Sequence, residues 1–186
     1  ASVLVLIYPR RGRLHLVLTL RTSEVDHHRD QVSFPGGKKD SHETISEAAL
    51  REAAEELGVP AEAVRVLGQL TPLYVPPSNF YIYPVVAASE KRPRFRPAPA
   101  EVAEVIDLPL DVLLDPAGRR QEVWHLHGLD TVGALVDRGD FGVAHDLLHR
   151  VLAGPTVAAE HLHRLHAHTE SPLPAVSLAH RRHQPA

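Results

Sequence analysis

Residues 37–59 read GKKDSHETISEAALREAAEELGV, and this stretch decides the fold. A tight turn is expected just before it, at the Pro-Gly-Gly of residues 35–37, because glycine adopts backbone conformations closed to other residues. From about residue 44 to residue 57 the chain holds good helix formers and neither proline nor glycine, which predicts a helix. Gly58 is expected to end that helix, and Pro60 to prevent it from resuming.

The predicted helix has an apolar side and an acidic side. At 3.6 residues per turn, one face collects Leu50, Ala53, Ala54 and Leu57. Another face collects three carboxylates at i, i+3 and i+4 spacing, with a cationic neighbour: Glu52, Glu55, Glu56 and Arg51. Adjacent carboxylates repel one another unless a cation lies among them, and Mg²⁺ or Mn²⁺ suits oxygen ligands. Taken alone, the same residues also fit a solvated acidic face.

The wider pattern separates these two interpretations. It consists of fixed identities in a fixed order: Gly37, Glu43, Arg51-Glu52, Glu55-Glu56, Gly58 and the apolar Val59. This stretch resembles the signature of the Nudix hydrolases without a gap. The resemblance implies an α/β/α sandwich with a mixed sheet between helices. It also implies hydrolysis of a diphosphate linkage in which a nucleoside diphosphate is joined to another group.

The resemblance also implies a role for each residue of the pattern. Glu52, Glu55, Glu56 and the carbonyl of Gly37 would bind Mg²⁺ or Mn²⁺. Glu43 would support them through a metal-bound water or a salt bridge to Arg51, which would orient the carboxylates. The general base would be Glu55 or Glu56, or a residue of a distal loop, for which Glu101 and Glu104 are the candidates.

Composition limits the remaining possibilities. The chain has 186 residues, a formal net charge of −3, 44% hydrophobic residues and no cysteine. These values fit one globular domain and argue against broad binding to nucleic acid or anionic membranes, and against disulfide or thiol chemistry. No apolar run approaches the roughly 20 residues that span a bilayer. A cytoplasmic enzyme fits this composition. Because the chain has no methionine and opens inside a strand-like pattern, we expect a native segment to precede it.

The rest of the chain reads as alternating strands and loops. Strands are expected over residues 2–8, 14–20, 64–70, 80–88, 101–108 and 121–127. A short extended segment is expected over 31–34, proline-rich and basic loops over 71–79 and 91–97, a helical turn over 110–114, and a second helix over 141–152. Pro84 suggests that its strand is an edge strand or carries a bulge. This mixture indicates a layered α/β domain.

We divide the chain into a Nudix domain over residues 1–153 and a tail over 154–186. The tail is rich in histidine, proline and alanine, and we expect it to be partly helical or disordered. A metal-binding tract is the alternative interpretation of its histidines.

The segment that leads to the turn carries a second resemblance. It looks like the extra signature of the coenzyme A diphosphatase branch of the family, and the matching residues are Leu18, Thr19, Arg21, His28, Gln31, Phe34, Pro35, Gly36 and Gly37. Two acids, Asp26 and Asp30, depart from that pattern. The residues over 76–80 and 83–85, PPSNF and YPV, also resemble this branch, as do stretches over 101–110 and 141–144.

The branch resemblance suggests a substrate and its contacts. Arg21, Phe34 and Ser78 are the expected substrate-binding residues, Arg21 because its planar guanidinium can grip phosphate oxygens; a surface salt bridge is its alternative role. The leading prediction is cleavage of coenzyme A or its thioesters to adenosine 3′,5′-bisphosphate and a phosphopantetheine. ADP-ribose or another nucleoside diphosphate derivative is the alternative substrate, and a non-catalytic nucleotide-binding module is the alternative of another class. The basic loop would meet a distant phosphate or remain solvated, and a homodimer is compatible with the family.

Overall fold

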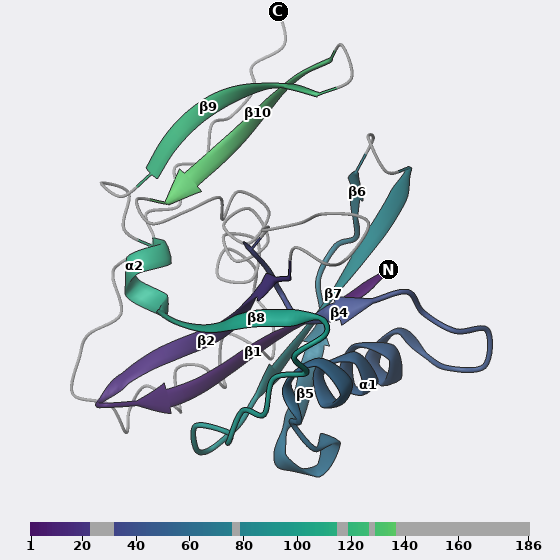
Figure 1. The fold of residues 1–186 in the computed structure, drawn as a ribbon, viewed down its shortest axis with the longest axis vertical. Coiled ribbons are helices and arrows are strands. Elements are labelled where there is room, and N and C mark those ends of the chain that lie inside the picture. The colour runs from purple at the N-terminus through teal and green to yellow at the C-terminus, as the bar shows by residue number, and fades with distance from the viewer. Residues whose placement is uncertain (23–31, 76–78, 115–118, 127–128, 137–186) are drawn as a thin grey trace, which may run out of the picture.

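The computed structural model describes residues 1–22, 32–75, 79–114, 119–126 and 129–136, and from residue 113 onward it describes the backbone only. A mixed sheet forms the centre of the molecule (Figure 1). Its main path runs β3 (Val32–Ser33), β2 (Arg13–Arg21), β1 (Ser2–Arg10), β7 (Phe80–Ala88) and β5 (Arg65–Gln69). Three further strands pair with members of this path: β4 (Gly36–Gly37) with β1, β6 (Leu73–Val75) with β7, and β8 (Val102–Pro109) with β2.

The remaining elements complete the described chain. They are the helix α1 (Ile45–Leu57), the 3₁₀ turn η1 (Ala61–Ala63), the short helix α2 (Leu110–Leu114), and an antiparallel pair of strands, β9 (Arg119–Leu126) and β10 (Leu129–Val136). Among the described residues, no helix is long and apolar enough to cross a membrane.

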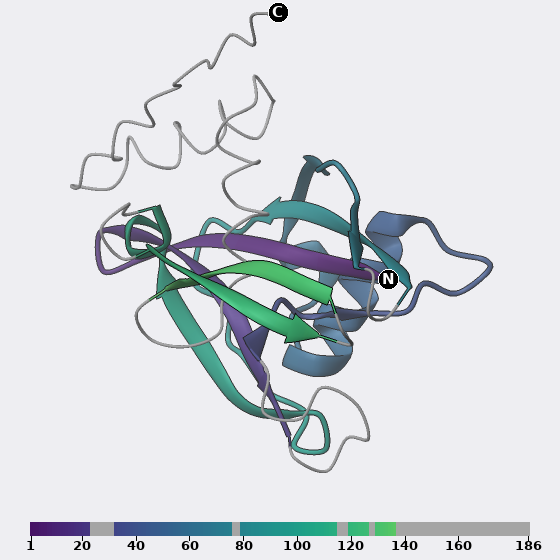
Figure 2. The same ribbon diagram turned by 90° about the horizontal axis from the view of Figure 1, so that it is seen from above.

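The strand β1, purple in Figures 1 and 2, lies in the middle of the sheet. It pairs antiparallel with β2, with Ile7 opposite Leu16, and parallel with β7, with Val5 beside Val86. Parallel and antiparallel neighbours on one strand confirm the mixed sheet that the sequence predicted. Apolar clusters pack on both faces of the sheet at β1, so its apolar run from Leu4 to Tyr8 is buried on both faces.

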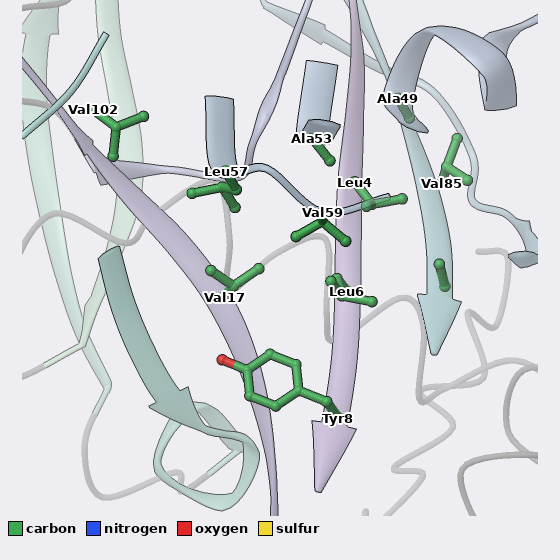
Figure 3. Close-up of a cluster of buried hydrophobic side chains, with 11 residues drawn as sticks. Leu4, Leu6, Tyr8, Val17, Ala49, Ala53, Leu57, Val59, Val85 and Val102 are labelled. Atoms are coloured by element: carbon green, nitrogen blue, oxygen red, sulfur yellow. The ribbon is translucent and has the colours of Figure 1, made fainter. Parts of the chain in front are cut away.

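Successive side chains of β1 point to opposite faces of the sheet. Val5 and Ile7 join a core cluster with Phe34 on one face. On the other face, Leu4, Leu6 and Tyr8 pack with the buried side of α1 (Figure 3). The helix residues in that cluster are Ala49, Ala53 and Leu57. The sheet therefore separates two apolar layers, and α1 covers one of them.

The caps of α1 follow from the signals in the sequence. The Thr44 hydroxyl accepts a hydrogen bond from the Glu47 N–H at 3.2 Å, and the Glu47 carboxylate accepts one from the Thr44 N–H at 2.7 Å, a capping box. Gly58 closes the helix in the left-handed conformation at φ 65°. One part of the helical wheel was wrong: Ala54 is exposed, and Glu56 is buried with the apolar residues.

The loop before β8 holds the C-terminal end of α1. The Arg96 N–H donates to the Leu57 carbonyl at 2.7 Å, and the Ala98 N–H donates to the Glu56 carbonyl at 2.9 Å. These bonds satisfy carbonyls that the last turn of a helix leaves without partners. They also fix the chain just before Glu101.

The predicted basic loop over residues 91–97 is anchored at Asp107 on β8. Arg92 donates two hydrogen bonds to the Asp107 carboxylate, at 2.9 and 2.8 Å, and lies over the Phe95 ring. The Tyr8 hydroxyl donates to the same carboxylate at 2.6 Å, and Arg10 pairs with it at 2.9 Å. Arg92 therefore forms structural contacts with Asp107 and Phe95 rather than being fully solvated.

Most predicted strands are confirmed within one to three residues, and two predictions about the hairpin region were wrong. Residues 71–79 were expected to be all loop, yet β6 lies within them and pairs with β7. The strand that contains Pro84 is interior rather than an edge, because β7 has neighbours on both sides. The Tyr83 N–H donates to the Ala1 carbonyl, so the backbone groups of Tyr83 face the edge of β7 toward β1. Successive residues of a strand turn their backbone groups to opposite edges, so the Pro84 nitrogen faces the other edge, where β5 ends and β6 begins.

One strand was missed, one bulge lies elsewhere than predicted, and several predictions fall outside the described residues. The sequence did not indicate β10. The bulge in the partner of β7 lies on β5, between Val66 and Gly68, rather than at Pro84. The helix expected over 141–152, the tail over 154–186 and the loop that contains His28, Asp26 and Asp30 lie outside the described residues.

Candidate active site

Two glycines bring the backbone of β4 against β1 and α1. Gly37 pairs with Ser2, and Gly36 pairs with Val3. A Cβ added at Gly36 would overlap the Ser2 carbonyl oxygen and the Val3 backbone, and one added at Gly37 would overlap the Glu52 carboxylate. Both positions therefore depend on the missing side chain, which lets the strand approach the acidic side of α1.

Glu56 is the buried carboxylate of the site, with a side chain only 3% exposed. Its Oε2 accepts a hydrogen bond from the Gly36 N–H at 3.1 Å, and its Oε1 lies 3.6 Å from Arg21 Nη1. Burial raises the pKa of Glu56 to about 7. The Gly36 hydrogen bond and the Arg21 charge oppose this rise, while the charges of Glu52 and Glu101 add to it.

Arg51 gathers the other carboxylates. Its Nε and Nη2 donate to the two oxygens of Glu43, at 3.1 and 2.9 Å. Its Nη1 lies 3.0 Å from a Glu52 oxygen and donates to Glu55 Oε2 at 2.9 Å. Nη2 also donates to the Lys38 carbonyl at 3.2 Å. One guanidinium thus links the loop after Gly37 to three glutamates.

The same contacts set the ionisation of two of these glutamates. Hydrogen bonds from Arg51 hold the pKa of Glu43 well below its ordinary value, at about 2, and the Asp40 N–H lowers it further. Burial raises the pKa of Glu52, against the opposing charge and hydrogen bond of Arg51. Glu43 is therefore a firmly charged partner for Arg51. For Glu52, burial raises the pKa more than the contacts with Arg51 lower it.

Glu101, which lies outside α1, also acts electrostatically on Glu52 and Glu56. It immediately precedes β8, its N–H donates to the Ala98 carbonyl at 3.0 Å, and its own carbonyl accepts from the Thr22 N–H at 3.2 Å. Its charge raises the pKa of both Glu52 and Glu56. The charge of Glu101 is therefore felt by Glu52 and Glu56, and its role as a general base stays a prediction.

The oxygen donors present suit a hard divalent cation. Within the described ranges, no three acidic or histidine side chains already converge as a metal site. Glu52 and Glu55 face Arg51, while Glu56 faces Gly36 and Arg21. The donors fit Mg²⁺ or Mn²⁺ in kind, and the Glu52 carboxylate already lies against the bare Cα of Gly37. Binding a metal would require the carboxylates of Glu52 and Glu55 to turn from Arg51.

The structure brings most of the predicted residues together. Glu43, Arg51, Glu52 and Glu55 form one network, and Gly37 contacts Glu52. Glu56 and Arg21 form a neighbouring pair. Phe34 is buried in the cluster that includes Val5 and Ile7, and its contact with a substrate stays a prediction. Ser78 lies outside the described residues.

Three features of the site escaped the sequence. The Gly36 N–H and the Lys38 carbonyl are backbone groups, which no side-chain pattern can reveal. The pairing of Arg21 with Glu56 joins residues 35 positions apart, on β2 and α1. The two motifs marked Arg51 and Arg21 as functional, and a surface salt bridge was the alternative for Arg21, but the sequence did not indicate that its partner is the buried Glu56.

These features define a known class of protein. The model of the NUDIX domain family matches residues 1–126, more than half of the chain, so the chain belongs to the Nudix family.

Two curated relatives place it more closely. An uncharacterized Nudix hydrolase, NudL of Pectobacterium atrosepticum, is 46% identical over 97 residues, which are 52% of this chain and 50% of that protein. The peroxisomal coenzyme A diphosphatase NUDT7 of Mus musculus is 40% identical over 116 residues, which are 62% of this chain and 49% of that protein. The chain therefore spans about half the length of the curated relatives it matches.

Solved structures agree on the fold. The Nudix hydrolase RenU of M. smegmatis superposes with a TM-score of 0.51 at 27% identity, over 58% of this chain and 68% of that one. A MutT/nudix family protein of Enterococcus faecalis gives a TM-score of 0.58 at 17% identity, over 87% of this chain and 65% of that one, a likeness of fold alone.

Proposed function

We propose that this chain is a metal-dependent hydrolase of the diphosphate linkage in nucleoside diphosphate derivatives, with coenzyme A or its thioesters as the leading substrate. The observation that carries the proposal is the placing of Glu52 against Gly37 and Glu56 against Gly36, with Glu55 linked to Glu52 through Arg51, in a chain of the Nudix family. The coenzyme A preference is supported by the segment from Leu18 to Gly37 and by the similarity to NUDT7.

Glu52, Glu55, Glu56 and the Gly37 carbonyl would hold Mg²⁺ or Mn²⁺. The bound metal would neutralise phosphate oxygens and lower the pKa of the attacking water. Arg51 would keep Glu52 and Glu55 on one side of the helix, and Glu43 would balance the charge of Arg51, as their ion pairs indicate.

The proton from the attacking water needs a nearby acceptor. Glu56 is the most buried carboxylate of the helix group, with a side chain 3% exposed, and is one candidate for this acceptor. Glu55 has the most exposed carboxylate of the helix group, 56% exposed, and is therefore the one most open to substrate. Glu101 remains a third candidate from the opposite side. Each of these three carboxylates can be tested by its own glutamine substitution.

Two alternatives follow from specific observations. Asp26 and Asp30 place negative charge in the segment that leads to Gly37, where an anionic substrate is expected, and this favours ADP-ribose or another nucleoside diphosphate derivative over coenzyme A. A non-catalytic nucleotide-binding module is the alternative of another class. The complete network of Glu43, Arg51 and Glu55 argues against it, because binding alone does not require all of these residues.

The test is product analysis by mass spectrometry. The protein would be incubated with Mg²⁺ or Mn²⁺ and with coenzyme A, acetyl-coenzyme A, ADP-ribose, NADH and nucleoside triphosphates. Glu55→Gln should abolish cleavage, whereas Glu62→Gln, an exposed change outside α1, should leave it intact. Adenosine 3′,5′-bisphosphate from coenzyme A would support the leading substrate. Cleavage of ADP-ribose alone would support the alternative substrate, and turnover that Glu55→Gln leaves unchanged would contradict the mechanism.

Product analysis does not address where the protein is located, its oligomeric state or its macromolecular partners. A cytoplasmic location, a homodimer and the absence of nucleic-acid or membrane partners remain predictions of the sequence.

A further inference from the structure

We propose that Arg21 serves the reaction through Glu56, as a positioning residue that holds this carboxylate in the site, rather than by gripping a substrate phosphate. The inference rests on the proposed function and deepens it, because it assigns Arg21 to the metal-binding carboxylates. Three observations carry it: the direction of the Arg21 side chain, the two contacts of Glu56, and the lack of other partners for both groups among the described residues.

The sheet directs Arg21 toward α1. Arg21 is the last residue of β2, and alternate residues of a strand share a face. Val17, four residues earlier, packs in the cluster beneath α1, so Arg21 lies on that same face. The pairing with β8 shifts here: Leu20 pairs with Glu104 but Arg21 pairs with Val102. The extra residue on β8 is a bulge, a feature that re-aims side chains at the end of a ladder.

Both oxygens of Glu56 are engaged by groups that hold it in one orientation. Oε2 accepts the Gly36 N–H at 3.1 Å, and Oε1 faces Arg21 Nη1 at 3.6 Å. The carboxylate is 3% exposed, so water does little to replace either contact. Within the described ranges, Arg21 is the cation paired with Glu56.

The guanidinium is equally dedicated to this pair. Its Nε is buried and has no hydrogen-bond partner among the residues described, and Glu56 is its ion-pair partner there. The Arg21 side chain is 26% exposed. Removing one member of a buried ion pair leaves an uncompensated charge, which is costly. Without Arg21, the Oε1 oxygen of Glu56 would lose the group that fixes its orientation, and a ligand position would be lost.

The test separates the two roles by measuring Mn²⁺ binding without substrate, using electron paramagnetic resonance of the free ion. The variants are Arg21→Gln, Glu56→Gln and the double substitution, with melting temperatures as a folding check. Arg13→Gln is the matched control, since Arg13 begins the same strand and pairs with Asp111 at the surface. We expect Arg21→Gln to weaken Mn²⁺ binding about tenfold, the effect of one charge-assisted contact. The control should stay at the wild-type value.

The double variant gives the decisive comparison. If Arg21 acts through Glu56, the double variant binds Mn²⁺ no more weakly than Glu56→Gln alone. Arg21→Lys, which keeps the charge, should recover most of the lost affinity. If Arg21→Gln does not fold, Arg21→Lys alone and combined with Glu56→Gln takes its place in the same cycle. Unchanged or tighter Mn²⁺ binding by Arg21→Gln, or fully additive losses, would overturn the proposal.

Turnover supplies an independent readout. At saturating Mn²⁺, a positioning residue predicts a lower kcat with the KM for substrate within about threefold of wild type, because KM reports substrate binding when substrate dissociates faster than it reacts. A phosphate contact predicts the reverse, a raised KM with unchanged Mn²⁺ affinity. If no substrate of the panel is cleaved, the proposed function fails, while the Mn²⁺ cycle still decides the role of Arg21.

Discussion

Glu56 should make the stability of the metal-free protein fall as the pH rises. Burial raises its pKa in the folded state from the ordinary 4.5 to about 7. A raised carboxyl pKa means that the folded chain binds more protons than the unfolded chain. The stabilisation from proton binding is therefore fully present below pH 4.5, declines through the interval, and is lost once the pH passes about 7.

The magnitude follows from the same two values. The gap between 4.5 and about 7 corresponds to about 3 kcal/mol, at 1.36 kcal/mol for each pH unit. The side chain is 3% exposed, so solvent screening calls for no large discount. For a protein of this size, such a difference shifts the melting temperature by about 6–12 °C.

The assay is urea unfolding of wild type and Glu56→Gln between pH 5 and pH 8, in chelator. Glutamine cannot ionise, so the stability of the variant relative to wild type should rise by about 2.5 kcal/mol across this range, part of the loss lying below pH 5. Added Mn²⁺ at pH 8 should stabilise wild type more than the variant, because the metal would bind the ionised carboxylate. A difference between the two proteins that stays constant from pH 5 to pH 8 would refute the reasoning.

Three further substitutions test other parts of the structure. Thr44→Ala removes the capping box of α1 and should cost about 1 kcal/mol in urea unfolding, with no change in the unfolding slope; an unchanged midpoint would contradict this. Gly37→Ala places a methyl group against the Glu52 carboxylate and should weaken Mn²⁺ binding, whereas Glu62→Gln, at an exposed position outside α1, should not. Asp107→Asn disrupts the contacts of Tyr8, Arg10 and Arg92 and should cost about 3 kcal/mol at pH 7; a loss below about 0.5 kcal/mol would show that the network is not stabilising.

The helix at the centre of the site was predictable because its signals are local. Thr44, Gly58 and the carboxylate spacing mark its ends and its acidic side within a few residues of sequence. The position of Glu56 was not predictable from the helical wheel. A wheel shows which residues share a face but not which face meets the sheet, and the Gly36 N–H that receives Glu56 belongs to another strand.

The strands were predictable one by one, but their neighbours were not. Apolar runs such as residues 2–8 indicate a buried strand from composition alone. The parallel pairing of β1 with β7 joins residues some eighty positions apart, and nothing in either strand specifies its partner. The three residues of β6 are too short to carry an alternating pattern, so the prolines on both sides made the whole segment resemble a loop.

The two backbone N–H groups that bind the C-terminal end of α1 restrict the length of the loop that carries them. Arg96 and Ala98 donate, and Pro97 and Pro99 alternate with them. Proline has no N–H to donate. Adding or removing one residue ahead of Arg96 would therefore bring a proline to a donor position, and would uncap a helix that carries four of the site's charges. Over evolutionary time, side chains in this loop are free to change more readily than its length, so insertions should accumulate elsewhere on the surface.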